Sequence, residues 1–233
     1  MMPLSIVILT YNSEKYLEEV LMSCQFADEV IIVDSGSTDT TCTIAQRFSN
    51  THVVQQPWLG FGRQKQKGVD ATRHEWVFVL DSDEVITDEL QDELKKTLQE
   101  PRYSGYFVPR INHFFGKAIK HLGLYPDLTL RLFHKDHGRF SENEVHEKVI
   151  LNAESGSLKA PMKHYAYDSI EQFIAKQNRY SSLGAKANPL KAVLNPSWTF
   201  FKLFILKGGF LEGWRGYVIA KLYAQYTFWK YIK

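Results

Sequence analysis

Short apolar runs alternate with amphipathic segments through the first hundred residues of the chain. The apolar runs are rich in β-branched residues, which predicts buried strands at 4–9, 30–33 and 76–80 and a short strand at 52–54. Between these runs, apolar side chains recur at the three- and four-residue spacing that is typical of helices. This alternation predicts an α/β fold with a doubly wound, mostly parallel, Rossmann-like sheet and right-handed crossovers.

The pattern changes after residue 100. Short β-like pieces alternate with polar loops between residues 101 and 168, and helical patterns follow from residue 169 to residue 233. We therefore expect three parts: residues 1–100, a smaller mixed β region at 101–168 that belongs to the same domain, and a C-terminal helical segment at 169–233.

Polar loops follow three of the expected strands. In an open α/β sheet, ligands bind at the carboxyl ends of the strands, so these loops are expected to converge on one crevice. The loops are Thr10–Asn12, Asp34–Asp39 and Asp81–Glu84. The glycine-rich fingerprint of NAD-binding folds is missing after the first strand, which favours a different nucleotide ligand.

Three carboxylates lie within the four residues Asp81-Ser82-Asp83-Glu84. Carboxylates this close together repel one another unless a cation compensates them. Hard oxygen ligands favour Mg²⁺ or Mn²⁺, and these ions commonly bridge to substrate phosphates. The alternative interpretation is a solvated acidic turn before the next helix.

The composition sets the class of protein. A net charge of +2 over 233 residues gives no sign of a nucleic-acid binder. Cys24 and Cys42 match no disulfide or zinc pattern, so free thiols in a reducing compartment are expected. The N-terminus lacks the basic region of a signal peptide, and no run of about 18 apolar residues predicts a transmembrane helix. We therefore expect a cytoplasmic protein.

The stretch from Ser197 to Lys233 is both aromatic and basic. It contains 12 of the 32 aromatic residues of the chain, and six lysines or arginines against one acid, Glu212. Segments of this kind, too short to span a membrane, favour peripheral contact with a membrane interface that carries anionic lipid. The alternative is a helical pair that packs on the domain or on a second subunit in a homodimer.

These motifs together resemble the family 2 inverting glycosyltransferases with the GT-A fold. The resemblance rests on Ile8–Asn12, Ile32–Thr40 and Leu80–Glu84, in the order and spacing of the family. Later segments resemble a narrower group, the bacterial glucosyltransferases that extend the inner core of lipopolysaccharide or lipooligosaccharide. These later segments are Tyr125–Asp127, Arg131–Phe133, Val145–Glu147 and His164-Tyr165.

The resemblance implies a UDP-linked sugar donor bound by residues 1–100. Glucose is the expected sugar, and the expected acceptor is a lipid-linked oligosaccharide at the cytoplasmic face of the bacterial inner membrane. It implies that Asp34 accepts a hydrogen bond from the base and that Asp81 lies near the ribose and the metal. The full donor-binding set is Thr10, Tyr11, Asn12, Asp34, Arg63, Lys67, Asp81 and Ser82.

The same resemblance assigns the metal and the chemistry. Mg²⁺ or Mn²⁺ would be bound by Asp83, with Asp81 and His164, and Arg131 would stabilise charge near the diphosphate. Inverting transfer needs a base that takes the proton of the acceptor hydroxyl. Glu147, beside His146, is our first choice.

The choice of base stays open because Glu144 and Asp127 are alternatives. The acidic residue followed by Asp that many family members carry in this region is missing here.

Two other functions were weighed. A nucleotidyltransferase would carry a glycine-rich phosphate loop after the first strand, where this chain has Thr10-Tyr11-Asn12-Ser13. A non-catalytic nucleotide-sugar-binding module would keep the pocket and lose the base, so comparing nucleotide binding with product formation separates it from an enzyme.

Overall fold

The computed structural model describes residues 1–141 and 147–233. These residues divide into two compact units. The first unit comprises Met1–Arg110 and Leu128–His164, and the second unit comprises Ile111–Asp127 and Tyr165–Lys233.

Over residues 4–81 the strands and helices follow the order that the hydrophobic pattern predicts, whereas several short strands after residue 81 were not predicted. The strands are β1 (Leu4–Thr10), β2 (Glu29–Asp34), β3 (Thr51–Gln55), β4 (Trp76–Asp81), β5 (Glu84–Ile86), β6 (Gly105–Phe114), β7 (Lys117–Ala118), β8 (Asp127–His134), β9 (Gly138–Phe140), β10 (Val149–Leu151), β11 (Ser155–Ser157) and β12 (Met162–Tyr167). The helices are α1 (Glu14–Ser23), α2 (Thr41–Ala45), α3 (Phe61–Asp70), α4 (Asp88–Thr97), α5 (Ile170–Leu183), α6 (Pro189–Phe201) and α7 (Trp214–Ile232), with a π-helical turn η1 (Lys202–Leu206) and a 3-10 turn η2 (Gly209–Glu212).

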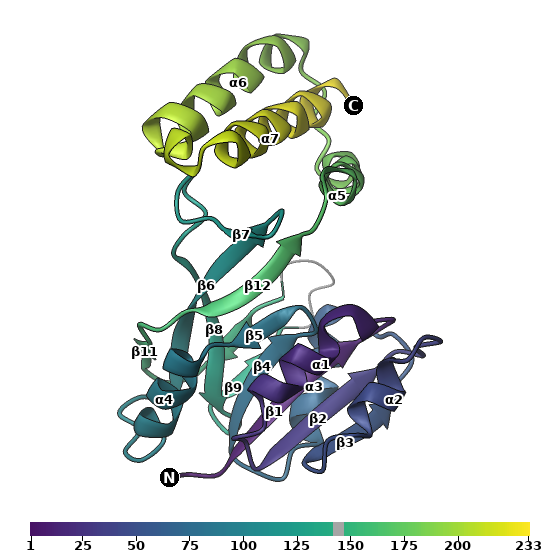
Figure 1. Cartoon of the computed structure of the whole chain (residues 1–233), viewed down its shortest axis with the longest axis vertical. Coiled ribbons are helices and arrows are strands. Elements are labelled where there is room, and N and C mark those ends of the chain that lie inside the picture. Colours follow the sequence, from purple (N-terminus) through teal and green to yellow (C-terminus); the bar gives the residue numbers. More distant parts are fainter. Residues whose placement is uncertain (142–146) are drawn as a thin grey trace. The chain divides into compact units, whose positions relative to one another are not determined.

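Among the described residues, the main sheet has the strand order β3-β2-β1-β4-β8-β6-β12-β5. β3, β2, β1 and β4 are parallel to one another, and β8 joins β4 in the antiparallel direction. Figure 1 shows the parallel strands side by side, with α1 and α2 close to them. The mixed α/β fold with a mostly parallel sheet, predicted from the sequence, is thus confirmed.

Both faces of the parallel sheet are buried. Val7 aligns with Ile31 and with Val79, and these residues pack with Val69 of α3. Ile8 is one residue further along and points to the opposite face of the sheet, where it is also fully buried. A strand that is buried on both faces reads as a continuous apolar run, and this explains why β1, β2 and β4 were easy to predict.

Helix α3 approaches the sheet closely at Gly68. A methyl group added there would lie 2.9 Å from Cγ2 of Val33 and closer still to a methyl group of Val7. Only glycine fits this contact without displacing the helix or the strands. The close approach matters for function, because α3 also carries Lys65 three residues earlier, on the same face.

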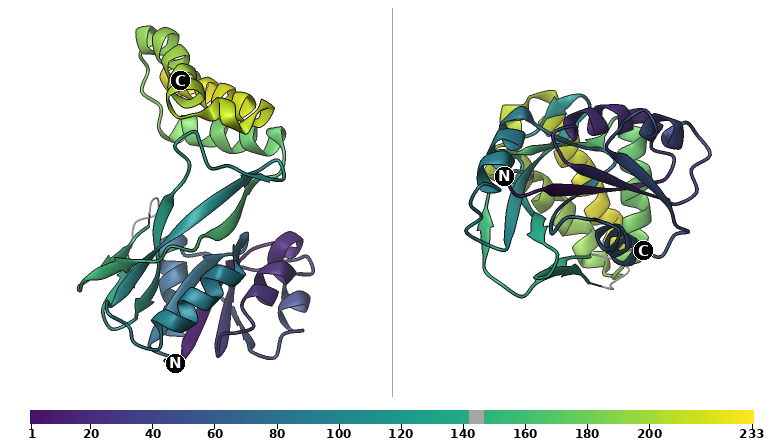
Figure 2. Two further views of the ribbon diagram at one scale, coloured as in Figure 1. Left: turned by 60° about the vertical axis from the view of Figure 1, so that its left-hand side comes forward. Right: turned by 90° about the horizontal axis from the view of Figure 1, so that it is seen from below.

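The second unit contains the C-terminal helices. Figure 1 shows α6 and α7 side by side, and α5 packs against α7, as Figure 2 also shows. Phe173 of α5 and Ile219 and Ala220 of α7 form a core with Phe114 at the end of β6. In the part of the chain that the structure describes, no helix is long and apolar enough to cross a membrane.

We predict that Gly68→Ala destabilises the protein by about 1–3 kcal/mol, because the added methyl group overpacks the contact between α3 and the sheet. Urea unfolding followed by circular dichroism measures the change. Gly184→Ala is the control, since a methyl group there makes an ordinary 3.5 Å contact with the carbonyl oxygen of Tyr180. A Gly68→Ala protein as stable as the control variant would contradict this account of the packing.

Candidate functional site

The loops after β1 and β2 are joined by side-chain hydrogen bonds. Thr10 Oγ1 donates to Asp34 Oδ1 over 2.9 Å, and the backbone N–H of Asn12 donates to Ser37 Oγ over 2.9 Å. In return, Asn12 Oδ1 accepts a hydrogen bond from the backbone N–H of Thr38. Asn12 has a φ of 48°, a left-handed conformation that asparagine tolerates better than most residues. The predicted convergence of these two loops is therefore present in the structure.

Asp34 is fully buried and holds its loop together. Oδ1 accepts hydrogen bonds from the hydroxyls of Thr10 and Ser37, and Oδ2 accepts from the backbone N–H groups of Gly36 and Ser37. Burial alone would raise the pKa of this carboxyl group, but the four donors outweigh it and lower the pKa. These donors match the lone-pair capacity of a carboxylate, so in this conformation Asp34 orders the loop.

The third loop begins at Asp81, where β4 ends. Its carboxylate lies 3.0 Å from Nζ of Lys65 and 3.0 Å from a guanidinium nitrogen of Arg131. Arg131 also donates to Glu84 Oε1 over 2.6 Å, and Arg110 donates to the same oxygen over 3.1 Å. The other oxygen of Glu84 accepts the backbone N–H of Asp81. Three basic side chains thus surround two of the acidic groups that the sequence singled out.

This arrangement favours the charged forms of Asp81 and Arg131. Burial alone would raise the pKa of Asp81, but Lys65 and Arg131 hold it well below its usual range. Burial alone would lower the pKa of Arg131, but Glu84 and Asp81 raise it. Arg131 was selected from the sequence as a cation near the diphosphate, and the structure places it beside Asp81.

Lys65 was missed by the sequence reasoning, which selected Arg63 and Lys67 from the same helix. Arg63 and Lys67 are on the exposed face of α3, whereas only 5% of the Lys65 side chain is exposed. The spacing along the helix could have indicated that Lys65 is buried. Lys65 precedes Gly68 and Val69 by three and four residues and therefore shares their buried face.

Lys65 also contacts Glu147, the first choice for the catalytic base. Its Nζ lies 2.9 Å from Oε1 of Glu147, and one ammonium group therefore bridges Glu147 and Asp81. The ring of Phe140 lies 5.9 Å from the same nitrogen. Of the other candidates, His146 and Glu144 lie outside the described residues, and Asp127 lies at the start of β8 in the second unit.

The remaining residues of the predicted site lie at the same edge of the sheet. Ser82 donates a hydrogen bond to Ser13 Oγ, and Tyr11 is 64% exposed. Nε2 of His164 lies 3.6 Å from Oδ2 of Asp83, whose side chain is 39% exposed. His164 is brought there by β12, in which it aligns with Glu84 of β5. An accessible carboxylate and a mostly buried imidazole, 13% exposed, form a donor set that fits Mg²⁺ or, better, Mn²⁺.

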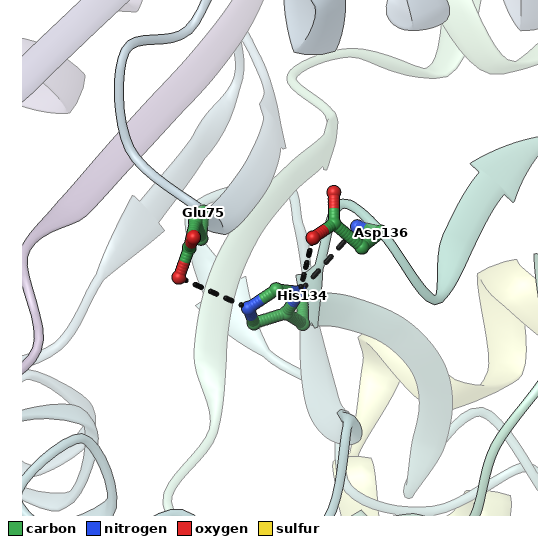
Figure 3. A group of neighbouring side chains, drawn as sticks. All are labelled: Glu75, His134 and Asp136. Carbon is green, nitrogen blue, oxygen red and sulfur yellow. Dashed lines mark hydrogen bonds and ion pairs between the residues drawn. The ribbon is translucent and has the colours of Figure 1, made fainter.

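A second group of potential metal ligands lies at the other end of β4 (Figure 3). Nε2 of His134 is 3.3 Å from Glu75, which precedes β4, and Nδ1 is 3.9 Å from Asp136. Both carboxylates are about two-thirds exposed, at 69% and 68%. Surface ion pairs account for this group, and it is separate from Asp81 and Asp83.

Comparison with known proteins identifies the class. The structural neighbours of this chain, with its parallel sheet continued by antiparallel strands, are GT-A glycosyltransferases. Residues 5–151 match the glycosyl transferase family 2 domain. The chain therefore belongs to glycosyl transferase family 2.

Similar proteins extend over nearly the whole chain. An uncharacterized glycosyltransferase of Rickettsia bellii is 31% identical over 99% of this chain and 85% of its own length. The lipopolysaccharide core biosynthesis glycosyltransferase LpsC of Rhizobium meliloti is 28% identical over 97% of this chain and 90% of its own length.

Two solved structures support the fold. TarS of S. aureus, in complex with UDP, has a TM-score of 0.55 and 21% identity, covering 91% of this chain and 75% of that one. The mannosyltransferase PcManGT of Pyrobaculum calidifontis, in complex with GDP-Man and Mn²⁺, has a TM-score of 0.60 and 14% identity, covering 98% of this chain and 86% of that one.

We predict that Lys65→Met lowers the free energy of unfolding at pH 7 by about 1–2 kcal/mol. The loss is smaller than for a fully buried pair because 35% of the Asp81 side chain is exposed. Urea unfolding measures it, with Lys67→Met, an exposed lysine on the same helix, as the control.

The pH dependence provides a second readout. The folded-state pKa of Asp81 lies below its unfolded value of about 3.9, so the ionised group stabilises the fold above that pH. This contribution disappears as the pH falls from there toward the folded-state pKa. Lys65→Met should therefore lose less stability on acidification than the native protein, and equal acid sensitivity would contradict the assigned ion pair.

Proposed function

We propose that the protein is an inverting glycosyltransferase that moves a sugar, glucose, from a UDP-sugar to a lipid-linked oligosaccharide. The observation that carries this proposal is a network of ion pairs that connects Asp81 with Lys65, Arg131 and, through Lys65, Glu147. The network lies at the carboxyl edge of the parallel strands, as does the loop held by Asp34. Membership of family 2 supports the reaction class, and the structure of TarS with UDP supports a uridine nucleotide.

The acceptor is proposed from the relatives and from the narrower resemblance. LpsC is named for lipopolysaccharide core biosynthesis, so an inner-core oligosaccharide is the acceptor that we assign. Such acceptors are built on lipid, which would place the reaction at the cytoplasmic face of the inner membrane.

Donor binding is assigned to the three loops. Residues 10–12 line the nucleoside pocket, where the exposed Tyr11 offers an aromatic ring to the base. Asp34 accepts a hydrogen bond from the base, which requires one of its present loop donors to give way. Ser82 and Asp81 lie at the end of β4 for contact with the ribose, and Arg63 and Lys67 stand as further cations on α3.

The metal site is assigned to Asp83, His164 and Asp81. Their oxygen and nitrogen donors fit Mg²⁺ or Mn²⁺, and Asp81 would bind the ion by giving up its contact with Lys65 or Arg131. PcManGT, which shares the fold, has a structure in complex with GDP-Man and Mn²⁺. When bound, the ion supplies positive charge to the diphosphate of the donor.

The transfer itself is a single displacement. The oxygen of the acceptor hydroxyl forms a bond with the anomeric carbon while the bond from that carbon to the diphosphate oxygen breaks. Glu147 takes the hydroxyl proton, and the diphosphate leaves with the bonding electrons. Arg131 and Lys65 are the fixed cations that stabilise the charge developing on it. No covalent bond to the enzyme is formed, so the anomeric configuration inverts.

We predict that Asp83→Ala weakens Mn²⁺-dependent binding of UDP by roughly tenfold or more. Loss of even an outer-shell partner of a metal costs about tenfold in affinity, and Asp83 is proposed as a direct ligand. Calorimetric titration of UDP with Mn²⁺ and then with EDTA measures this. Asp136→Ala, which removes an exposed carboxylate at the other end of the sheet, is the matched control and should bind normally. Tight UDP binding by Asp83→Ala in Mn²⁺ would remove Asp83 from the metal site.

We predict that Glu147→Gln lowers kcat by about 10²–10⁴-fold while UDP binding is retained, because the amide cannot take the proton. Product formation from UDP-glucose and a lipid-linked core acceptor measures the rate. Asp127→Asn and Glu144→Gln are the comparisons. Loss of activity in one of these, with Glu147→Gln active, would move the base to that residue. If the native protein binds UDP but transfers no sugar from any UDP-sugar, the non-catalytic binding module is favoured.

A further inference from the structure

Helix α6 has an apolar stripe that the second unit leaves exposed. The stripe consists of Leu190, Val193, Leu194, Trp198 and Phe201, whose exposed fractions range from 44% to 70%. Their spacing of three and four residues places them on one side of the helix. The opposite side is used internally, since Ala192 is buried and Thr199 Oγ1 lies 3.2 Å from Thr227 Oγ1 of α7.

The apolar surface continues beyond the end of α6. Ile205 and Leu206 of η1, Phe210 and Leu211 of η2 and Trp214 at the start of α7 are 45% to 59% exposed. Together with the stripe they form what we call the C-terminal apolar surface. Beside it, a groove of about 510 Å³ between α6 and α7 is lined by Val193, Phe200, Phe228 and Lys221, among others. Exposed apolar side chains gathered on consecutive helical segments in this way are typical of a site of interaction.

The aromatic residues of this segment separate into two sets. Phe200, Phe204 and Tyr223 pack against the core of the second unit. Trp198 and Phe201 are not part of that core and are 56% and 44% exposed. Phe210 and Trp214 each contact one ring at the edge of the core, Phe204 and Phe115, and are 52% and 58% exposed. Packing within the chain therefore leaves roughly half of each of these four side chains exposed.

The charges around this surface are positive. Lys191 of α6, Lys202 of η1, Lys207 directly after η1 and Lys221 of α7 are exposed. Residues 189–233 contain one acid, Glu212, and it is 6% exposed. Its carboxylate accepts from the backbone N–H groups of Lys120 and His121 and from the side chains of His121 and Lys117. Burial alone would raise the pKa of Glu212, but these donors lower it to about 2. The acid is thus neutralised inside the unit and does not offset the exposed lysines.

We propose that the C-terminal apolar surface is a docking site for the surface of an anionic lipid bilayer. The apolar stripe would enter the boundary between headgroups and acyl chains, and the lysines would contact acidic headgroups. A symmetric pairing of two copies through the same surface is disfavoured, because it would bring four exposed lysines against the same four lysines. Docking at a bilayer would bring the protein to the lipid-linked acceptor of the proposed function. The inference itself rests on the exposed apolar and basic side chains and does not depend on the reaction that the protein catalyses.

Vesicle flotation of the purified full-length chain, without donor or metal, tests the proposal. We expect the protein to float with phosphatidylcholine vesicles that contain about one-third phosphatidylglycerol, and not with phosphatidylcholine alone. Leu194→Glu/Trp198→Glu should weaken partitioning about tenfold or more by placing charge in the apolar stripe. Lys191→Gln/Lys202→Gln should weaken it by about fivefold per lysine, and high salt should do the same to the native protein.

Matched variants control for nonspecific effects. Met22→Glu places a charge on an exposed apolar residue of α1, 63% exposed against 59% for Leu194, and should float like the native protein. Lys95→Gln/Lys96→Gln removes two lysines from α4 with the same expectation. Circular dichroism and UDP titration establish that each variant is folded, and UDP titration also tests the donor site separately from docking.

Three outcomes would overturn the proposal. The first is that the native protein fails to float with the anionic vesicles. The second is that folded Leu194→Glu/Trp198→Glu floats as well as the native protein. The third is that light scattering finds a dimer in solution that this variant converts to a monomer, with no binding to vesicles, which would assign the surface to a second copy.

Discussion

The candidate site depends on one constraint, the burial of Glu84 at the end of the parallel sheet. A buried carboxylate is costly unless cations and hydrogen-bond donors compensate it. Arg131, Arg110 and the backbone N–H of Asp81 supply that compensation. Arg131 is long enough to reach Asp81 as well, so the same guanidinium fixes both carboxylates. Strand β8, which carries Arg131, is thereby linked to β4 by charge as well as by backbone hydrogen bonds.

The parallel half of the fold could be predicted because its strands are buried on both faces. Continuous apolar runs such as Val30–Val33 have one stable location, inside the sheet, and the polar residues that follow must then lie at its edge. Thr10, Asp34 and Asp81 were found in this way. Their ion pairs with distant residues could not be predicted from the sequence. Arg131 lies 50 residues after Asp81, and no local sequence pattern indicates that the two side chains are in contact.

Lys65 shows a different limit of sequence reasoning. A lysine is rarely buried, and the basic residues Arg63, Lys65 and Lys67 follow one another at every second position, so their types alone do not single out Lys65, which shares the face of Gly68 and Val69. The C-terminal aromatics pose the same difficulty. Composition counted them together, whereas the structure separates Phe200 and Phe204, which pack inside, from Trp198 and Phe201, which do not. In both cases the burial of each residue, rather than its type, decides what it can do.

The balance of charge in the site bears on the role of Asp83. Asp81, Glu84 and Glu147 carry three negative charges, and Lys65, Arg110 and Arg131 carry three positive charges in direct contact with them. Among the described residues, Asp83 makes its direct contact with His164, and its charge acts on Arg131 only at longer range, where it helps to raise the pKa of that guanidinium. It is also more exposed than Glu84 or Glu147, with 39% of its side chain accessible. A carboxylate that is accessible and is not held by a direct lysine or arginine contact among the described residues is well suited to bind an added cation, and this supports Asp83 as the proposed metal ligand.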